Sequence, residues 1–257
     1  MTEPMLKVRD VDMLFGGLKA VDNLSIDIPA GTTTALIGPN GAGKTTVFNI
    51  ITGFLKPQRG TVEFEGEIIT GRRPDQIARG GIARSFQDLK LFRGLTCFEN
   101  VLAATAARHG ESITGSMLSR RAIAKETTER GDAVMHWLEI AGLADRRGTL
   151  AQDLGYAEAK MLAIARVLAL DARLYLLDEP CSGLDQKALE RVRALIDGLL
   201  EGGATVCIIE HNMALVRDVA EVGIFLEQGA FVASDQIDAL LEDERMRERY
   251  LGLGGTK

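Results

Sequence analysis

The sequence predicts an α/β protein with a mostly parallel sheet, an antiparallel strand-rich region before it and a helical segment inserted into it. Two observations predict the parallel sheet. In the second half of the chain, apolar strands at 174–178 and 205–209 alternate with helices at 158–169 and 186–200. Strands that alternate with helices form parallel sheets, because each helix returns the chain to the edge where the next strand begins. The second observation is a glycine-rich turn at 38–46, which joins a short apolar strand to a helix.

Residues 1–69 are predicted to form short strands joined by turns. Residues 6–11 and 20–28 alternate apolar and polar side chains, which is typical of half-exposed strands. The run at 33–37 is apolar and rich in β-favouring residues, and 60–69 is interpreted as two short strands on either side of a glycine. We expect this part of the sheet to be antiparallel.

The middle of the chain is rich in Ala, Leu and charged residues, and helical spacing is present at 98–108 and 122–140. We therefore expect a helical subdomain at about 94–149, inserted into a single domain whose core and β subdomain comprise about 1–93 and 150–257. The remaining predicted elements are a helix at 45–54, a strand at 82–86, a helix at 214–219, a hairpin of 222–226 with 230–233, and a terminal helix at 236–251.

Composition limits the classes of function. The chain has 257 residues, a net charge of −6 and a pI near 5.3, whereas nucleic-acid-binding proteins are usually basic. Its three cysteines, Cys97, Cys181 and Cys207, lack the spacing of a disulfide framework or a zinc site, which fits a reducing cytosol. No apolar segment suggests a secretory signal, and no run of about 18 uncharged apolar residues suggests a membrane-spanning helix.

The turn Gly38–Thr46 fits the pattern G-x-x-x-x-G-K-[ST] at every fixed position. A strand that leads through such a turn into a helix forms a phosphate-binding loop, because the glycines let backbone N–H groups point inward. Lys44 can then reach the β- and γ-phosphates, and the Thr45 hydroxyl can bind Mg²⁺. The alternative is a glycine-rich turn that carries a lysine by chance. The residues expected to hold the nucleotide here are Gly38, Asn40, Gly41, Ala42, Gly43, Lys44, Thr45 and Thr46.

Polar side chains follow three of the predicted strands. Asp178 and Glu179 end the apolar strand 174–178, at the strand edge where α/β folds bind ligands. Asp178 suits an Mg²⁺ site, and Glu179 suits a group that polarises the attacking water. His211 follows the strand 205–209 and is within reach of a γ-phosphate, although a lone histidine is more often structural. Gln87 also ends a strand and could contact the metal or the water.

At this point the sequence resembles the ATP-binding subunits of ABC transporters, over essentially its whole length. The matching motifs, in order, are the phosphate loop Gly38–Thr46, the Q-loop Phe86-Gln87, the signature Leu154-Gly155-Tyr156-Ala157-Glu158, the Walker B segment 174–179, the D-loop 182–185 and the switch His211. The resemblance implies a P-loop NTPase fold of ABC type that binds ATP and Mg²⁺. It implies that Phe15 stacks on adenine, where the alternative is a core Phe, and that the signature and Asp185 contact a nucleotide.

Finer features resemble the ATPases of branched-chain amino acid importers. These are Phe-Gly-Gly-Leu-Lys-Ala-Val at 15–21, Ser-Phe-Gln-Asp-Leu-Lys-Leu-Phe at 85–92, Glu-His-Asn-Met at 210–213 and Arg-Tyr-Leu-Gly at 249–252. The resemblance implies a second ATPase subunit, identical or related, and two membrane permease subunits fed by a periplasmic or extracellular solute-binding protein. The chain would then lie at the cytoplasmic face of the cell membrane, as a peripheral subunit, and would bind no nucleic acid.

The signature departs from the family pattern, which is close to Leu-Ser-Gly-Gly-Gln and in this branch often Leu-Ser-Tyr-Gly-Gln. Gly155 lacks the serine hydroxyl, and Ala157 adds a Cβ where the backbone approaches a phosphate. A lost charge-assisted hydrogen bond costs about 1.5–3 kcal/mol, which slows a site about tenfold or more. We therefore expect an asymmetric ATPase, in which the site that uses this chain's signature is the weaker one.

Three alternatives stay open. The chain could serve another ABC transporter, for urea, another small solute or lipopolysaccharide. It could be a non-transport ABC ATPase acting in DNA repair or translation, although the acidic pI argues against this. It could also be a nucleotide-binding regulatory subunit with little turnover.

Overall fold

The computed structural model describes residues 3–86, 88–105 and 120–243, without the side chains of 120–128. These residues form two compact units. We call the first the sheet unit; it comprises Met1–Arg84, Ala172–Pro180 and Ile196–Lys257. The second, which we call the helical unit, comprises Ser85–Asp171 and Cys181–Leu195. The helical unit is therefore larger than the inserted segment that the sequence predicts.

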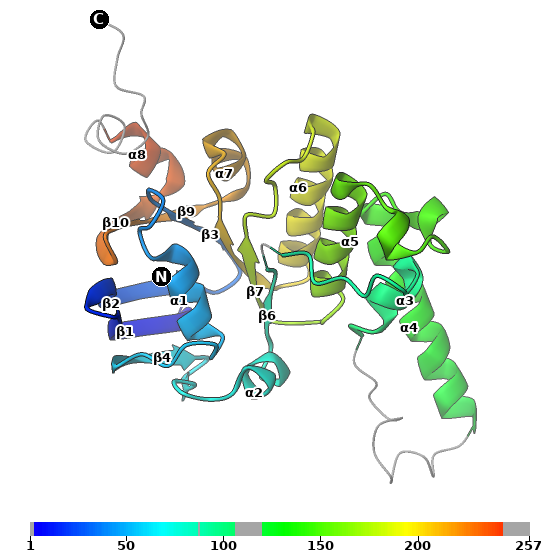
Figure 1. Cartoon of the computed structure of the whole chain (residues 1–257), viewed down its shortest axis with the longest axis horizontal. Helices are drawn as coiled ribbons and strands as arrows, with labels where there is room; N and C mark the ends of the chain where they lie inside the picture. Colours follow the sequence, from blue (N-terminus) through cyan, green and yellow to red (C-terminus); the bar gives the residue numbers. More distant parts are fainter. Residues whose placement is uncertain (1–2, 87, 106–119, 244–257) are drawn as a thin grey trace, which may run out of the picture. The chain divides into compact units, whose positions relative to one another are not determined.

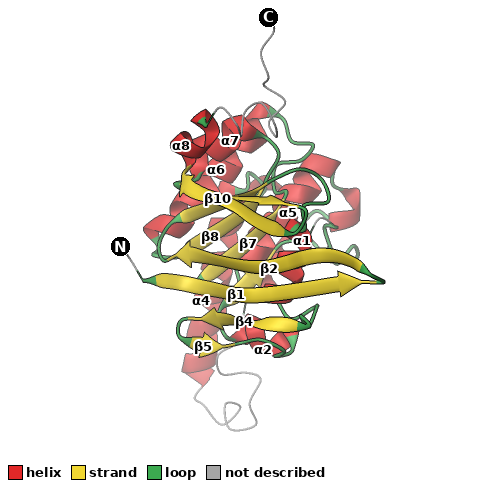
Figure 2. Cartoon of the chain, turned by 90° about the vertical axis from the view of Figure 1, so that its left-hand side faces the viewer, coloured by secondary structure: helices red, strands yellow, loops and turns green. Residues whose placement is uncertain are grey.

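The sheet unit contains a four-stranded antiparallel sheet in the order β2-β1-β4-β5 (Figure 2). Its strands are β1 (Pro4–Phe15), β2 (Leu18–Pro29), β4 (Arg59–Phe64) and β5 (Glu67–Ile68). The antiparallel arrangement is confirmed. β1 and β2 extend beyond the predicted 6–11 and 20–28, because their paired ends near the turn are exposed and so lack apolar alternation.

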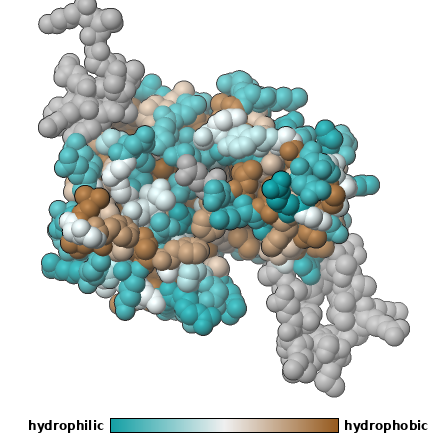
Figure 3. All heavy atoms as spheres, in the orientation of Figure 1, coloured by the Kyte–Doolittle hydropathy of each residue, from teal (hydrophilic) through white to brown (hydrophobic). Residues whose placement is uncertain are grey.

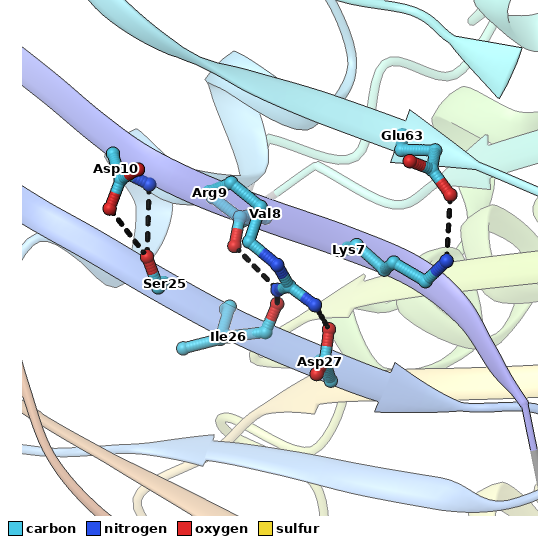
Figure 4. A network of polar contacts seen from close by, with 8 residues as sticks. All are labelled: Lys7, Val8, Arg9, Asp10, Ser25, Ile26, Asp27 and Glu63. Atoms are coloured by element: carbon cyan, nitrogen blue, oxygen red, sulfur yellow. Dashed lines mark hydrogen bonds and ion pairs between the residues drawn. The ribbon is translucent and has the colours of Figure 1, made fainter. Parts of the chain in front are cut away.

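Ion pairs join neighbouring strands of this sheet (Figure 4). Nζ of Lys7 on β1 donates a hydrogen bond to Oε1 of Glu63 on β4 at 2.8 Å, and the two residues are direct partners in the register. Nη2 of Arg9 donates to Oδ1 of Asp27 on β2 at 2.6 Å. Exposed pairs of this kind each contribute little to stability. Opposite charges in facing positions do favour this register over one that would place like charges together.

The second sheet of the sheet unit has six strands in the order β10-β9-β3-β8-β7-β6. They are β3 (Thr33–Ile37), β6 (Ile82–Arg84), β7 (Leu174–Asp178), β8 (Thr205–Ile209), β9 (Val222–Glu227) and β10 (Ala230–Gln236). All pairings are parallel except the β9–β10 hairpin. Every residue of β3, β7 and β8 is buried, which explains why their sequences are mostly apolar and do not alternate with exposed polar residues.

The register of the six-stranded sheet determines where the functional side chains meet. Ile209 at the end of β8 is the partner both of Leu36 on β3 and of Asp178 on β7. The carboxyl ends of these three strands therefore lie at one edge of the sheet. The segments that follow them, which include the glycine-rich turn and His211, begin at this edge.

Among the described residues, the helices that lie wholly in the sheet unit are α1 (Lys44–Ile51), α2 (Pro74–Arg79), α7 (Met213–Val219) and α8 (Ile237–Glu242) (Figure 1). Phe48 and Ile51 of α1 belong to the same buried cluster as side chains from both sheets, so α1 helps to build the core. The sequence did not predict α2, which is short and has a single buried residue, Ile77. The predicted helix 236–251 begins as expected, and its residues from 244 lie outside the described part.

The helical unit contains α3 (Cys97–Leu102), α4 (Arg120–Ile140), α5 (Tyr156–Leu168) and the residues up to Leu195 of α6 (Gln186–Glu201). Short 3₁₀ turns lie at Ala144–Arg146 and Ala151–Asp153. Thr96 begins α3 with a capping box: it accepts from the Glu99 N–H while the Glu99 carboxylate accepts from Thr96. The predicted helix at 98–108 ends at Leu102, and its residues 106–108 lie outside the described part.

No helix in the described ranges combines the length and the apolar character needed to span a membrane. On the face drawn in Figure 3, hydrophilic residues predominate and hydrophobic ones are interspersed among them. The large apolar side chains that are exposed include Phe15 and Leu18 at the end of the β1–β2 hairpin.

Candidate active site

The glycine-rich turn after β3 has a backbone that only glycine can supply at two positions. Gly38 has φ +147°, and a Cβ there would lie 2.1 Å from the carbonyl oxygen of Leu226. Gly43 has φ +93°, and a Cβ there would lie 2.4 Å from the carbonyl oxygen of Ala20. Both positions combine a left-handed backbone with close packing, so the glycines of the motif are required by the structure.

Lys44 points back into the turn. Its Nζ donates hydrogen bonds to the carbonyl oxygens of Gly38 at 2.7 Å and Pro39 at 2.9 Å. Burial lowers the pKa of Lys44, while the negative charges of Glu179 and Asp178 oppose this effect. An ammonium group held among neutral carbonyls can bind a phosphate oxygen strongly, because a charged acceptor is better than a neutral one.

The start of α1 is suited to an anion. Gly43 is its N-cap and provides no side-chain hydrogen bond, and the first turn has no acidic residue. The first N–H groups of a helix have no partner within it, and the helix dipole places partial positive charge there. The turn and the helix start together form a phosphate-binding cradle.

A cavity of about 590 Å³ lies over this cradle. Its walls are formed by residues 40–46, by the first residues of β2, and by Glu179, His211 and Gln228. The volume is within the range of small-molecule sites. The structure therefore brings the predicted residues Asn40 to Thr46 into one cavity with Glu179 and His211, while Gly38 packs against the backbone of Leu226.

Glu179 and His211 contact each other at the cavity. Nε2 of His211 lies 3.2 Å from Oε1 of Glu179. The backbone N–H of Glu179 donates to the carbonyl of Ile209 at 2.9 Å, which continues the β7–β8 pairing by one residue. Glu179 has φ +47°, an uncommon conformation for a residue with a side chain, and such strain is concentrated at functional sites.

Asp178 is buried beside Glu179 and forms an ion pair with Arg84. Nη2 of Arg84 lies 3.2 Å from Oδ2 of Asp178, and both side chains are 5% exposed. Arg84 also donates to Oδ1 of Asn49 at 2.6 Å and to Oγ1 of Thr52 at 3.2 Å, both on α1. Burial raises the pKa of Asp178, and the positive charge of Arg84 opposes that rise. Sequence reasoning missed Arg84, because a single arginine in a short strand carries no motif.

The residues at this site fit Mg²⁺ bound together with phosphates. Thr45 lines the cavity and supplies a hydroxyl, and Asp178 supplies a carboxylate at the end of β7, next to the cavity residue Glu179. No group of three or more His, Cys, Asp or Glu residues in the described ranges could hold a metal by itself. Mg²⁺ commonly uses only one or two protein ligands and completes its shell with waters and substrate phosphates. Gln87, the other predicted metal contact, lies outside the described residues.

Phe15 ends β1, is 45% exposed and pairs with Leu18, which lines the cavity. Phe15 itself does not line the cavity. Sequence reasoning missed Leu18 and its neighbours Lys19 and Asp22, which contribute an apolar face and an ion pair to the wall. The hydrogen bond that Lys19 donates to the carboxylate of Asp22 raises the pKa of Lys19.

The signature lies in the helical unit, where it starts α5. Gly155 is the N-cap of the helix, and Oε2 of Glu158 accepts a hydrogen bond from the Gly155 N–H at 3.1 Å. Nε of Arg146 lies 3.4 Å from Oε1 of Glu158. The first turn of α5 is thus capped by one of its own carboxylates. Leu154, Tyr156 and Ala157 are partly or fully exposed around it.

Asp185, predicted to contact a nucleotide, has a local structural partner. Its Oδ1 accepts a hydrogen bond from the backbone N–H of Ala188 at 2.8 Å, which caps the start of α6.

Comparison with known proteins identifies the family. A family model described as ABC transporter matches residues 21–182. The high-affinity branched-chain amino acid transport ATP-binding protein BraF of Pseudomonas aeruginosa is 35% identical, over 98% of this chain and 99% of that protein. The corresponding protein LivG of Salmonella typhimurium is 36% identical, over the same shares.

Solved structures agree. The ADP conformation of MJ1267, an ATP-binding cassette of an ABC transporter, superposes with a TM-score of 0.81 and 30% identity, and the match covers 99% of this chain and 100% of that chain. The dimeric post-hydrolysis state of the cassette MJ0796, bound to ADP and Pi, has a TM-score of 0.76 and 26% identity, over 91% and 99%. This chain belongs to the ABC transporter family, as an ATP-binding and ATP-hydrolysing subunit.

Proposed function

We propose that this chain powers an importer of branched-chain amino acids. The observation that carries the proposal is the similarity to branched-chain amino acid transport ATP-binding proteins, which extends over 98% of the chain. The glycine turn with Lys44 and the Glu179–His211 contact support it, because they supply the parts that ATP hydrolysis requires.

We assign the following roles to the predicted site residues. Lys44 and the backbone N–H groups at the start of α1 bind the β- and γ-phosphates. Thr45 and Asp178 hold Mg²⁺, which supplies charge neutralisation on the phosphates when it is bound. Glu179 orients and polarises the attacking water, and His211 holds the Glu179 carboxylate and faces the terminal phosphate. Gln87 contacts the metal or the water, and Phe15 stacks on adenine.

The proposed assembly contains a second ATPase subunit, two membrane permease subunits and a solute-binding protein outside the membrane. The dimeric relative bound to ADP and Pi supports the pairing of two ATPase subunits. In this arrangement the chain lies at the cytoplasmic face of the membrane, and each nucleotide is bound between the phosphate loop of one subunit and the signature of the other. The Q-loop and the helical subdomain at about 94–149 transmit closure to the permeases.

The proposed ATPase is asymmetric. Gly155 provides no side-chain hydroxyl at the start of α5. In addition, Glu158 holds a negative charge against that helix start, where a phosphate from the other subunit has to approach. Both features weaken the composite site that uses this signature. The chain's own ATP site retains the residues that hydrolysis requires, namely Lys44, Asp178 and Glu179.

The test is purification of the tagged chain from solubilised membranes, followed by reconstitution of what is bound to it. Two polytopic membrane proteins should co-purify, and ATP turnover in proteoliposomes should rise when a leucine-loaded binding protein is added. If urea or another solute stimulates ATP turnover and leucine does not, that solute would replace branched-chain amino acids as the proposed substrate. A chain recovered without any polytopic partner would overturn the importer proposal.

A further inference from the structure

A buried lysine connects the signature helix to the D-loop. Lys160 lies on α5, is only 7% exposed, and its Nζ donates a hydrogen bond to the backbone carbonyl oxygen of Ser182 at 2.6 Å. Ser182 is the first residue of the D-loop 182–185, and both partners belong to the helical unit. A buried ammonium is costly unless it is hydrogen-bonded, so this contact constrains both segments.

A second contact joins the same two segments one helical turn earlier. Gly183 has φ +75°, and a Cβ there would lie 2.9 Å from Cε1 of Tyr156, so the tyrosine ring packs closely on the glycine. Tyr156 and Lys160 are four residues apart and therefore lie on the same face of α5. The D-loop is thus held against the first turns of the signature helix at two consecutive residues.

The end of the D-loop is fixed as well. Asp185 caps α6 through the N–H of Ala188, so the loop cannot shift along the helix that follows it. The D-loop can then move only if the backbone of Ser182 and Gly183 separates from α5. The hydrogen bond from Lys160 opposes that movement.

We propose that Lys160 is a positioning residue for ATP hydrolysis, which holds the D-loop and the signature as one rigid surface toward the nucleotide of the paired subunit. This inference rests on the proposed function, since it requires the two-subunit arrangement. Lys160 touches neither the nucleotide nor the reacting atoms. It acts through the Ser182 carbonyl, so its loss should slow turnover without weakening ATP binding at the chain's own phosphate loop.

The experiment compares Lys160→Met, Lys160→Arg and Lys187→Met in the assembled transporter carrying Glu179→Gln, in which only the site that uses this chain's signature is active; kcat and KM below are the rate constant and the ATP dependence of single-turnover hydrolysis at that site. Methionine fills a similar volume without a donor, and arginine keeps a donor for the same carbonyl. Lys187 is an exposed lysine of α6 and is the matched control. We expect Lys160→Met to lower kcat about tenfold, a change of the size that misplacement of a catalytic group produces, with KM for ATP changed less than about twofold. Lys160→Arg should recover most of the rate, and Lys187→Met should match the unmodified chain.

A spin label at Ser182→Cys gives a readout that does not depend on activity. The three native cysteines are all buried, whereas position 182 is exposed, so labelling favours that site. Lys160→Met should increase the mobility of this label in the purified chain, and Lys187→Met should leave it unchanged. If Lys160→Met does not fold, Gly183→Ala decides the question. A Cβ at position 183 would lie 2.9 Å from Cε1 of Tyr156, so this contact between the D-loop and α5 has to shift, and kcat should fall while ATP binding is retained.

A normal kcat in Lys160→Met, or a reduced kcat that Lys160→Arg does not raise, would overturn the inference. An unchanged label mobility would do the same. Glu179→Gln, measured in parallel, separates this result from failure of the proposed function. Loss of most steady-state turnover in Glu179→Gln alone, with an unchanged single-turnover rate on adding Lys160→Met, rejects the positioning role alone, whereas steady-state turnover that survives Glu179→Gln rejects the assignment of the site.

Discussion

Nε2 of His211 lies 3.2 Å from Oε1 of Glu179, although the two residues follow different strands of the parallel sheet. The contact arises from the register, because Ile209 pairs with Asp178 and its carbonyl then accepts from the N–H of Glu179. A histidine in this position can fix the rotamer of the carboxylate. The carboxylate is then oriented toward the cavity before any ligand binds, which is the preorganisation that electrostatic catalysis depends on.

We predict that Glu179→Gln abolishes most ATP turnover of the assembled complex while ATP binding is retained. Glutamine keeps the shape and can still contact His211, but it cannot polarise water as a carboxylate does. Loss of a general base of this kind typically costs a factor of about 10²–10⁴. The measurements are phosphate release by the complex and binding of a fluorescent ATP analogue by the purified chain. Turnover above about a tenth of the unmodified rate would contradict the role given to Glu179.

Gly38→Ala and Gly41→Ala should differ strongly in stability. Both glycines have positive φ, but a Cβ at Gly38 would lie 2.1 Å from a backbone oxygen, whereas a Cβ at Gly41 meets nothing within 4 Å. Gly41→Ala therefore costs only its left-handed backbone, about 1 kcal/mol. Gly38→Ala also forces a shift of β9, which adds about 1–3 kcal/mol. Urea denaturation of the purified chain measures both variants. Equal losses would show that the contact with Leu226 is not rigid.

Arg84→Met should destabilise the chain by about 3–5 kcal/mol, because it leaves the buried carboxylate of Asp178 without its ion-pair partner. Arg9→Met is the matched control, since the Arg9–Asp27 pair is exposed and should contribute less than about 1 kcal/mol. Urea midpoints in the presence of EDTA give both values. If the two variants lose similar amounts of stability, the buried Arg84–Asp178 pair contributes no more to the free energy of unfolding than the exposed Arg9–Asp27 pair.

The Arg84→Met variant should also lose stability as the pH rises. Burial already raises the pKa of Asp178, and Arg84 opposes that rise, so its removal raises this pKa further. A carboxyl group with a raised pKa in the folded state keeps its proton after the unfolded chain has released it. Its contribution to stability is therefore full below the unfolded pKa, near 4, and falls as the pH passes the folded value. Urea midpoints between about pH 5 and 8 should fall more steeply for Arg84→Met than for the unmodified chain.

The sequence predicted strands β3, β7 and β8 at their observed bounds, because fully buried parallel strands have short, mostly apolar and β-favouring sequences between clear turn signals. It also predicted that Glu179 would lie at the strand edge where α/β folds bind ligands, because strand ends in a parallel sheet meet at one edge, and the glycine turn and Glu179 line one cavity. It did not predict α2, whose six residues bury only Ile77. Nor did it predict Arg84 or Lys160, since a buried charge is recognised only when its distant partner is known.

Restoring the signature should raise turnover. Gly155→Ser with Ala157→Gly returns a hydroxyl to the N-cap of α5 and removes a Cβ from its first turn. Serine is a better N-cap than glycine by a few tenths of a kcal/mol, so the fold should be retained. If the missing hydroxyl weakens one composite site by about 1.5–3 kcal/mol, that site should accelerate about tenfold or more. The measurement is single-turnover hydrolysis in a complex in which Glu179→Gln inactivates this chain's own ATP site, so that only the site using this signature is active.

Because Glu158 still caps the helix in the double variant, a further Glu158→Gln should increase the rate again by removing a negative charge near the incoming phosphate. An unchanged rate in both variants would mean that this site is limited by something other than its signature, and the asymmetry would then need another cause.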